Sequence, residues 1–124
     1  MQVARSSLDA LLLKNVCDVR FVRRNPRPGD GPTRRMFATK SYEILNSLNG
    51  RTTLNYRPPG GPRRVNEALS NLLVVWDILM QDYRIINCDQ VTLLETIPAD
   101  EFWPYFNDNI YPMSPEQKVG YMNT

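Results

Sequence analysis

Residues 72–95, LLVVWDILMQDYRIINCDQVTLLE, form the densest apolar stretch of the chain. β-Branched and aromatic residues are concentrated in two short runs within it, and the segment LMQD at 79–82 separates these runs. Because such residues favour extended backbone, the two runs predict a β-hairpin, and 91–95 predicts a third strand directly after it. The stretch therefore predicts a mainly β fold.

Two further strands are predicted upstream of this hairpin. Apolar and polar residues alternate over 16–24, which is typical of a strand with one buried face. Residues 34–40, RRMFATK, predict the next strand, and their alternation leaves two registers open. The inward-facing residues are either Met36 and Ala38 or Phe37 and Thr39.

Short helices are predicted where serine precedes an apolar pattern. Ser6 and Ser7 precede LDALLLKN, whose leucines recur at helical spacing and predict a capped helix that covers one end of a sheet. Residues 41–48, SYEILNSL, predict a helical turn capped by Ser41. Residues 65–71 fit either a helix or the approach to a strand.

Proline and glycine are concentrated in two stretches that predict loops. The first, NPRPGDGPT at 25–33, separates the two upstream strands. The second, RPPGGPRR at 57–64, follows residues 51–56, which have the composition of a strand. Both loops contain arginine.

The chain changes character after Pro98, where aromatic residues are mixed with acidic residues and prolines. Because aromatic side chains are costly to leave in water, the tail at 99–124 is expected to pack on its own domain, with a short helix at 100–106, or to bind a partner. The predicted organisation is a small β-barrel domain with an N-terminal helix over 1–98, followed by this tail. The candidate partner-binding residues are Phe102, Trp103, Tyr105 and Phe106.

Composition argues against several classes of protein. A length of 124 residues suits one domain. There is no histidine and no Cys-x-x-Cys, so no metal site and no other cofactor is expected, and Cys17 and Cys88 are expected to be buried thiols. No apolar run is long enough to cross a membrane, and the start MQVARSS lacks the apolar stretch of a signal peptide. A cytoplasmic protein is therefore expected.

The recognisable catalytic motifs are missing from the sequence. A serine or cysteine nucleophile normally needs a base such as histidine, and the chain has no histidine. The glycine-rich segments do not have the residue order of a phosphate-binding loop. Asp77, Asp82 and Asp89 are near enough in sequence for a carboxylate pair or a magnesium site. Asp82 and Asp89 suit turns better, however. We predict that the protein is not an enzyme.

Charge is distributed unevenly along the chain. Residues 1–64 contain 13 Lys and Arg against 4 Asp and Glu, whereas residues 65–124 contain 2 against 9. The net charge of +2 conceals this difference. Twelve of the 15 basic residues are arginine, whose guanidinium group suits bidentate contacts with phosphate or carboxylate and stacking on bases.

Several motifs within 16–96 resemble the small WYL-like, Sm-fold proteins of tailed bacteriophages. The resemblance lies in VRFVRR, GPTRRMFATKSYEIL and VVWDILMQDYRIINCDQV. It implies a small Sm- or SH3-like β-barrel that binds nucleic acid or protein, in the host cytoplasm if the protein is viral, and it supplies no catalytic residues. The chain departs from the family pattern in the length of 49–71 and in its aromatic tail. The matching residues are Arg34, Met36, Ala38, Thr39, Val75, Trp76, Asp77, Tyr83, Arg84, Asp89 and Val91.

The arginine-rich loops carry the functional prediction, which is binding of RNA or single-stranded DNA. Guanidinium contacts with phosphates give salt-dependent and largely sequence-independent affinity. Phe37, Tyr42 and Tyr56 are candidates for base stacking, although the core is the expected place of Phe37. The candidate nucleic-acid-binding residues are Arg23, Arg24, Arg27, Arg34, Arg35, Arg51, Arg57, Arg63 and Arg64.

Other interpretations of these arginines remain open. They could form a solvated face, or pair with the acidic half of their own chain. Opposite charges on two halves of one chain also suit head-to-tail self-association. The alternative function is therefore a protein–protein interaction module that assembles with itself or binds and inhibits a host protein.

Overall fold

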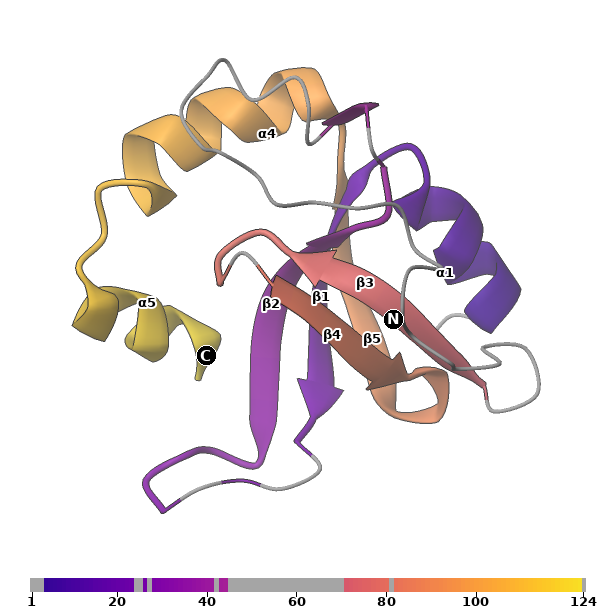
Figure 1. The fold of residues 1–124 in the computed structure, drawn as a ribbon, viewed down its shortest axis with the longest axis horizontal. Coiled ribbons are helices and arrows are strands. Elements are labelled where there is room, and N and C mark those ends of the chain that lie inside the picture. Colours follow the sequence, from indigo (N-terminus) through magenta and orange to yellow (C-terminus); the bar gives the residue numbers. More distant parts are fainter. Residues whose placement is uncertain are drawn as a thin grey trace.

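A computed structural model describes residues 4–23, 26, 28–41, 43–44, 71–80 and 82–123. In these residues five strands form one antiparallel sheet in the order β4-β3-β2-β1-β5 (Figure 1). The mainly β class and the N-terminal helix are confirmed. The strands are β1 (Val16–Val22), β2 (Thr33–Thr39), β3 (Leu72–Asp77), β4 (Asp82–Asn87) and β5 (Val91–Ile97). The helices are α1 (Arg5–Leu12), the 3₁₀ turn η1 (Cys88–Gln90), α4 (Ala99–Tyr105), the π-helical turn η2 (Phe106–Ile110) and α5 (Pro115–Met122).

The predicted hairpin and its third strand are confirmed. β3 and β4 pair from Leu72↔Asn87 to Asp77↔Asp82, so the chain reverses between Asp77 and Asp82, and Asp82, predicted to belong to the turn at 79–82, is the first residue of β4. The short turn η1 then leads into β5, and the Asn87 side chain caps this turn by accepting a hydrogen bond from Asp89 N at 2.9 Å. β5 runs two residues beyond the predicted end, to Ile97.

The sheet bends sharply between β2 and β3. These two strands share only the pairs Ala38↔Asp77 and Thr39↔Trp76, so the β3–β4 ribbon turns away and crosses in front of β1, β2 and β5 (Figure 1). β4 and β5 form the two edges of the described sheet, which is open rather than closed into a barrel.

The inside of the bend holds the first of two hydrophobic cores. All five strands contribute to it, and Leu8 and Leu12 of α1 cover one end, as their helical spacing predicts. The carbonyl of Leu12 also accepts hydrogen bonds from Lys40 N at 2.9 Å and Thr39 Oγ1 at 3.2 Å, which fix the helix to the end of β2. The strand residues of this core are Cys17, Val19, Met36, Ala38, Leu73, Val75, Ile86, Val91 and Leu93.

The second core lies on the opposite face of β1 and β2, under the C-terminal segment. Phe37 is 2% exposed and packs edge-on against Phe102 of α4, with ring centroids 5.2 Å apart. Both registers left open for β2 are therefore partly right, because Met36 and Ala38 face one core while Phe37 faces the other. The tail packs on the sheet of its own domain (Figure 1).

One helix boundary differs from its prediction. Helix α1 begins at Arg5, and its N-cap Ala4 offers no side-chain hydrogen bond, so the expected serine cap is wrong. The predicted turn at Ser41 is supported, because Ser41 Oγ accepts a hydrogen bond from Ile44 N at 3.1 Å. The predictions for 45–48, 51–56, 57–64 and 65–70 lie outside the described residues. In the described part, no helix has the length and apolar character needed to span a membrane.

A candidate nucleic-acid interface

Three of the nine candidate arginines lie in the described part of the chain: Arg23, Arg34 and Arg35. All three are more enclosed than a solvated basic face would be, since their side chains are between 10% and 29% exposed. Whether the two predicted loops meet on one surface falls outside the described residues. The six candidates that also lie outside are Arg24, Arg27, Arg51, Arg57, Arg63 and Arg64.

Arg34 of β2 forms a buried ion pair with Asp77, the last residue of β3. Its Nη2 donates to Asp77 Oδ2, and its guanidinium carbon lies 5.8 Å from the centroid of the Phe21 ring. Burial lowers the pKa of Arg34, while the Asp77 carboxylate opposes that effect. Arg84 and Arg23, both nearby cations, lower the pKa further. Arg34 is thus a desolvated cation with two positively charged neighbours.

Arg35 points to the other face of β2 and is held there by Asp18 of β1. Its Nε and Nη2 donate to the two carboxylate oxygens of Asp18 at 3.0 and 2.6 Å, a bidentate contact. The hydrogen bonds to Asp18 raise the pKa of Arg35 above its ordinary value. The guanidinium also lies 4.9 Å above the ring of Tyr121. These contacts make Arg35 a structural residue.

Arg23 follows β1 directly and is oriented by the C-terminal end of α5. Its Nη2 donates to Asn123 Oδ1 at 2.7 Å, and its Nη1 lies 3.9 Å from Asp30 Oδ2. Asn123 Oδ1 also accepts a hydrogen bond from Gly31 N at 3.3 Å. One amide oxygen therefore joins Arg23 to the loop that precedes β2.

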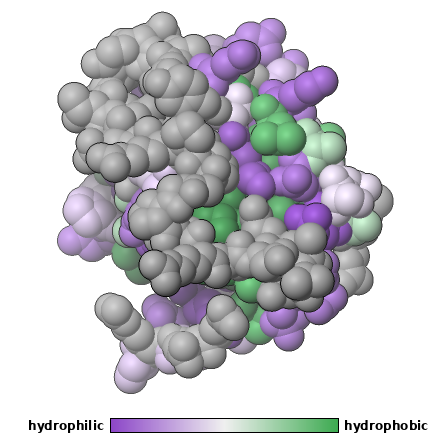
Figure 2. Space-filling model, turned by 45° about the vertical axis from the view of Figure 1, so that its right-hand side comes forward, coloured by the Kyte–Doolittle hydropathy of each residue, from purple (hydrophilic) through white to green (hydrophobic). Residues whose placement is uncertain are grey.

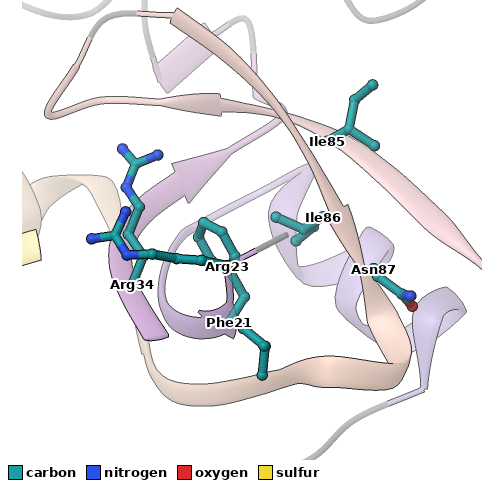
Figure 3. Close-up of a pocket in the computed structure, with 7 residues that line it drawn as sticks. Phe21, Arg23, Arg34, Ile85, Ile86 and Asn87 are labelled. Carbon is teal, nitrogen blue, oxygen red and sulfur yellow. The ribbon is translucent and has the colours of Figure 1, made fainter. Parts of the chain in front are cut away.

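Arg23 and Arg34 form one side of a pocket of about 220 Å³ between β1, β2 and β4. Figure 3 shows their guanidinium groups next to each other, with Phe21 beside them and Ile86 across the pocket. The Nε of each arginine is buried and has no hydrogen-bond acceptor. The pocket is lined by Phe21, Val22, Arg23, Arg34, Ile85, Ile86 and Asn87. It combines two cationic donors with apolar walls, and we call it the arginine pocket.

Arg84 is a cation near this pocket that the sequence argument did not select as a site residue. It lies on β4, and its Nη1 contacts Asp82 Oδ2 at 2.9 Å. Its influence on Arg34 arises because β3 and β4 fold back over β1 and β2. The local sequence contains no motif that predicts this bend. The closeness of Arg84 to Arg34 could therefore be recognised only in the tertiary structure.

A second pocket, of about 310 Å³, lies between β1, β2, β5, α4 and α5. Phe37 and Tyr121 stack in it with ring centroids 5.3 Å apart, and Tyr105 approaches Phe37 edge-on at 6.5 Å. Burial raises the pKa of Tyr121, and the nearby Asp18 carboxylate adds to that effect. The lining residues are Asp18, Arg35, Phe37, Glu95, Ile97, Glu101, Tyr105 and Tyr121. We call it the acidic aromatic pocket.

The four candidate partner-binding residues divide into two groups. Phe102, Trp103 and Phe106 are at most 7% exposed and belong to the second core, so they are used in the chain's own packing. Tyr105 is 47% exposed and lines the acidic aromatic pocket. Of these residues only Tyr105 presents a ring to an external partner in the described structure.

Two of the large exposed apolar side chains on the described surface lie together. Met80 in the hairpin turn and Val119 on α5 line one open pocket of about 370 Å³ with Leu79, Pro115 and Lys118, whereas Leu13 lies apart, after α1. On the face drawn in Figure 2, the hydrophobic residues form small areas between hydrophilic ones. The pocket of Met80 and Val119 contains one charged residue, Lys118, so in the described part of the chain the candidate sites with clustered polar groups are the arginine pocket and the acidic aromatic pocket.

The carboxylates considered for metal binding are dispersed among different partners. Asp77 pairs with Arg34, Asp82 with Arg84, and Asp89 accepts a hydrogen bond from Asn71 Nδ2 at 2.6 Å. Within the described ranges there is no cluster of three or more His, Cys, Asp or Glu residues suited to a metal ion. Cys17 and Cys88 are buried free thiols, as predicted.

Pairing between the basic and acidic halves of the chain is limited in the described residues. Arg34–Asp77 joins the two halves. The pairs Arg35–Asp18, Lys40–Asp9 and Arg23–Asp30 lie within the basic half, and Arg84–Asp82 lies within the acidic half.

Comparison with known proteins identifies no relative of this chain. No family model, no curated protein and no solved structure matches the chain.

Proposed function

We propose that this protein is a non-enzymatic nucleic-acid-binding protein that contacts RNA or single-stranded DNA through arginine, with one backbone phosphate held in the arginine pocket. The observation that supports this proposal is that Arg23 and Arg34 line one pocket together. Guanidinium groups suit direct contacts with phosphate oxygens.

Electrostatics favour an anion at this position. Arg23, Arg34 and Arg84 lie close enough together to affect the ionisation of Arg34, and the fully buried carboxylate among them is Asp77. Arg34 is also partly desolvated, and charge–charge interactions are stronger where water is excluded. The lining of the pocket contains two arginines and no carboxylate, so a phosphate there would meet two cationic side chains. The apolar walls formed by Phe21 and Ile86 suit the sugar or base attached to it.

The rest of the affinity is assigned to the arginines predicted from sequence, above all those at 51–64. Phosphate contacts of this kind act additively and release counterions, so binding should weaken steeply with salt. Of the proposed stacking residues, Phe37 is buried and is excluded from that role. Tyr42 and Tyr56 lie outside the described residues and stay predictions.

The first test is fluorescence anisotropy with labelled single-stranded RNA and DNA, titrated from low to physiological salt. Arg23→Gln should weaken binding and reduce the slope of log K against log salt by about 0.7, the value for one phosphate contact on a single strand. Lys14→Gln, which removes one exposed positive charge at the end of α1, is the matched control. Absence of binding at low salt would refute the proposal. A slope unchanged by Arg23→Gln would remove the arginine pocket from it.

We extend the proposal to the fold family that the sequence motifs suggest. The sheet would be an open relative of a small Sm- or SH3-like barrel, acting in the cytoplasm, or in the host cytoplasm if the protein is viral. The supporting observation is that β3 and β4 fold over β1, β2 and β5 around one shared core. An experimental structure that shows β4 and β5 on opposite sides of a flat sheet would contradict this relation.

A second candidate function is a protein–protein interaction module. The acidic aromatic pocket favours it, because exposed carboxylates and a half-exposed Tyr105 line one cavity. Removing Phe102–Phe106 to test self-assembly would also remove core residues, so Tyr105→Ala is the cleaner variant. Light scattering then compares the mass in solution with the 14.4 kDa of one chain.

A further inference from the structure

The described residues that line the acidic aromatic pocket carry more negative than positive charge. Arg35 and Asp18 lie at its inner side and neutralise each other through two hydrogen bonds. The remaining charged residues in its lining are Glu95 of β5 and Glu101 of α4, and both are exposed. Glu95 is the register partner of Asp18 across β1 and β5, which places it beside the Arg35–Asp18 pair. A ligand that enters from solvent meets two carboxylates.

The guanidinium group of Arg35 already lies in this pocket, and its contacts show which kind of ligand the pocket suits. Arg35 lies 4.9 Å above the Tyr121 ring while it donates two hydrogen bonds to Asp18. Stacking on an aromatic ring together with a bidentate carboxylate contact is the preferred environment of arginine. Tyr105, with Glu95 and Glu101, offers the same combination of ring and carboxylate at the exposed side. A second guanidinium is therefore the fitting ligand.

We propose that this pocket binds an arginine side chain of a second copy of the chain. Charge complementarity points to this occupant, because residues 1–64 carry 13 basic residues and residues 65–124 carry 9 acidic residues. The stretch 51–64, RTTLNYRPPGGPRR, contains four arginines and no acidic residue. Residues 20–35 contain more arginines, six, but Asp30 within them already pairs with Arg23. This inference goes beyond nucleic-acid binding and gives the second candidate function a site.

The contact has a consequence for the size of the assembly. It joins the arginine-rich stretch 51–64 of one copy to the acidic aromatic pocket of another. Two copies that exchange this contact form a closed dimer, and a one-way contact forms a ring or an open chain. In each case the mass should rise with protein concentration above that of one chain. Salt should reverse the association, because the contact is electrostatic and partly exposed.

The experiment measures mass by sedimentation velocity and light scattering over a range of concentrations, at low and high salt. The wild-type mass should rise above 14.4 kDa at low salt. The variant Glu95→Gln/Glu101→Gln should stay near that mass. The control variant Asp108→Asn/Glu116→Gln changes the net charge equally at two exposed positions outside the pocket and should associate like the wild type. Oligonucleotide binding should persist in both variants, which separates this inference from the proposed function.

A labelled peptide with the sequence 51–64 identifies the occupant. It should bind wild type and the control variant, bind the Glu95→Gln/Glu101→Gln variant at least tenfold more weakly, and compete with self-association. A wild-type protein that stays monomeric at every concentration would overturn the inference, even if the peptide binds, because the occupant would then not be a second copy. Equal association of both variants, or equal loss in both, would also overturn it.

Discussion

Arg34 on β2 and Asp77 at the end of β3 form a buried ion pair between residues 43 positions apart. Asp77 lies where β2 and β3 share their two pairs and the sheet begins to bend, and Arg34 reaches it from a position four residues before Ala38 on β2. Asp77 Oδ1 also accepts a hydrogen bond from Met80 N at 3.1 Å, and so supports the turn of the hairpin. One carboxylate thus connects the arginine pocket, the bend and the hairpin.

Replacing Asp77 by Asn should lower the free energy of unfolding by about 3–5 kcal/mol, because it leaves Arg34 charged, buried and without its partner. The amide oxygen of Asn still accepts from Met80 N, so the charge is the main change. Urea unfolding measures the loss. Asp82→Asn, which breaks the exposed pair with Arg84, should cost about 1 kcal/mol or less. Equal costs for the two variants would show that the buried pair has no special role.

Phe102→Ala should destabilise the whole domain by about 3–5 kcal/mol, because a fully buried aromatic ring leaves a cavity in the second core. Tyr105→Ala, three positions further along the same segment, should cost only about 0.5 kcal/mol, the usual size of a surface change. Chemical unfolding followed by tryptophan fluorescence compares them. A tail that docks only on partners would give two small effects.

Stability should fall as the pH rises above 9. Burial raises the pKa of the Cys17 thiol from its ordinary 9.0 to about 12, and a hydrogen bond with Thr96 opposes this only in part. Above pH 9 the unfolded chain therefore loses a proton that the folded chain keeps. The free energy of unfolding then decreases by at most about 1.4 kcal/mol per pH unit.

Urea unfolding between pH 9 and 10 tests this prediction. The range stops at pH 10 because the pKa of Tyr121 is also raised above its ordinary 10.0, so Tyr121 adds a further loss of stability at higher pH. Cys17→Ala should flatten the slope even though it lowers stability overall. A slope that is identical in Cys17→Ala would assign the effect to another group.

Ser114→Ala should cost about 1 kcal/mol, the usual value of a lost N-cap. Ser114 Oγ accepts from Gln117 N at 3.2 Å, and the Gln117 side chain returns a contact to Ser114 N at 2.8 Å. Ser114→Asp keeps a capping oxygen and should retain most of the stability. Thermal unfolding of the two variants separates the capping oxygen from other effects of the substitution, and equal losses would contradict the assignment.

The strands were predictable because their signals are local. Alternation over 16–24 and the two runs within 72–86 report extended backbone directly, and their bounds agree with β1, β3 and β4 within about two residues, the usual uncertainty at element ends. The inward face of β2 was not predictable, because alternation assumes one buried face. The tail buries the other face, so Phe37 and Met36 are both in cores.

The candidate sites depended on contacts that sequence spacing does not report. Composition marked arginine as the important residue, yet it could not show that Arg34 and Arg35 point to opposite faces of β2 and pair with Asp77 and Asp18. The acidic aromatic pocket combines residues from five elements, none of which forms a motif alone. The serine cap of α1 failed because the helix begins before both serines.

Asn123 holds an arginine 100 positions earlier in the chain, and this affects how the protein should be handled. Because Asn123 Oδ1 contacts both Arg23 and Gly31, the geometry of the arginine pocket depends on an undisturbed end of α5. Proteolytic trimming that removes Asn123 would take away the acceptor of the Arg23 hydrogen bond. Binding assays should therefore use protein whose measured mass shows that Asn123 is retained.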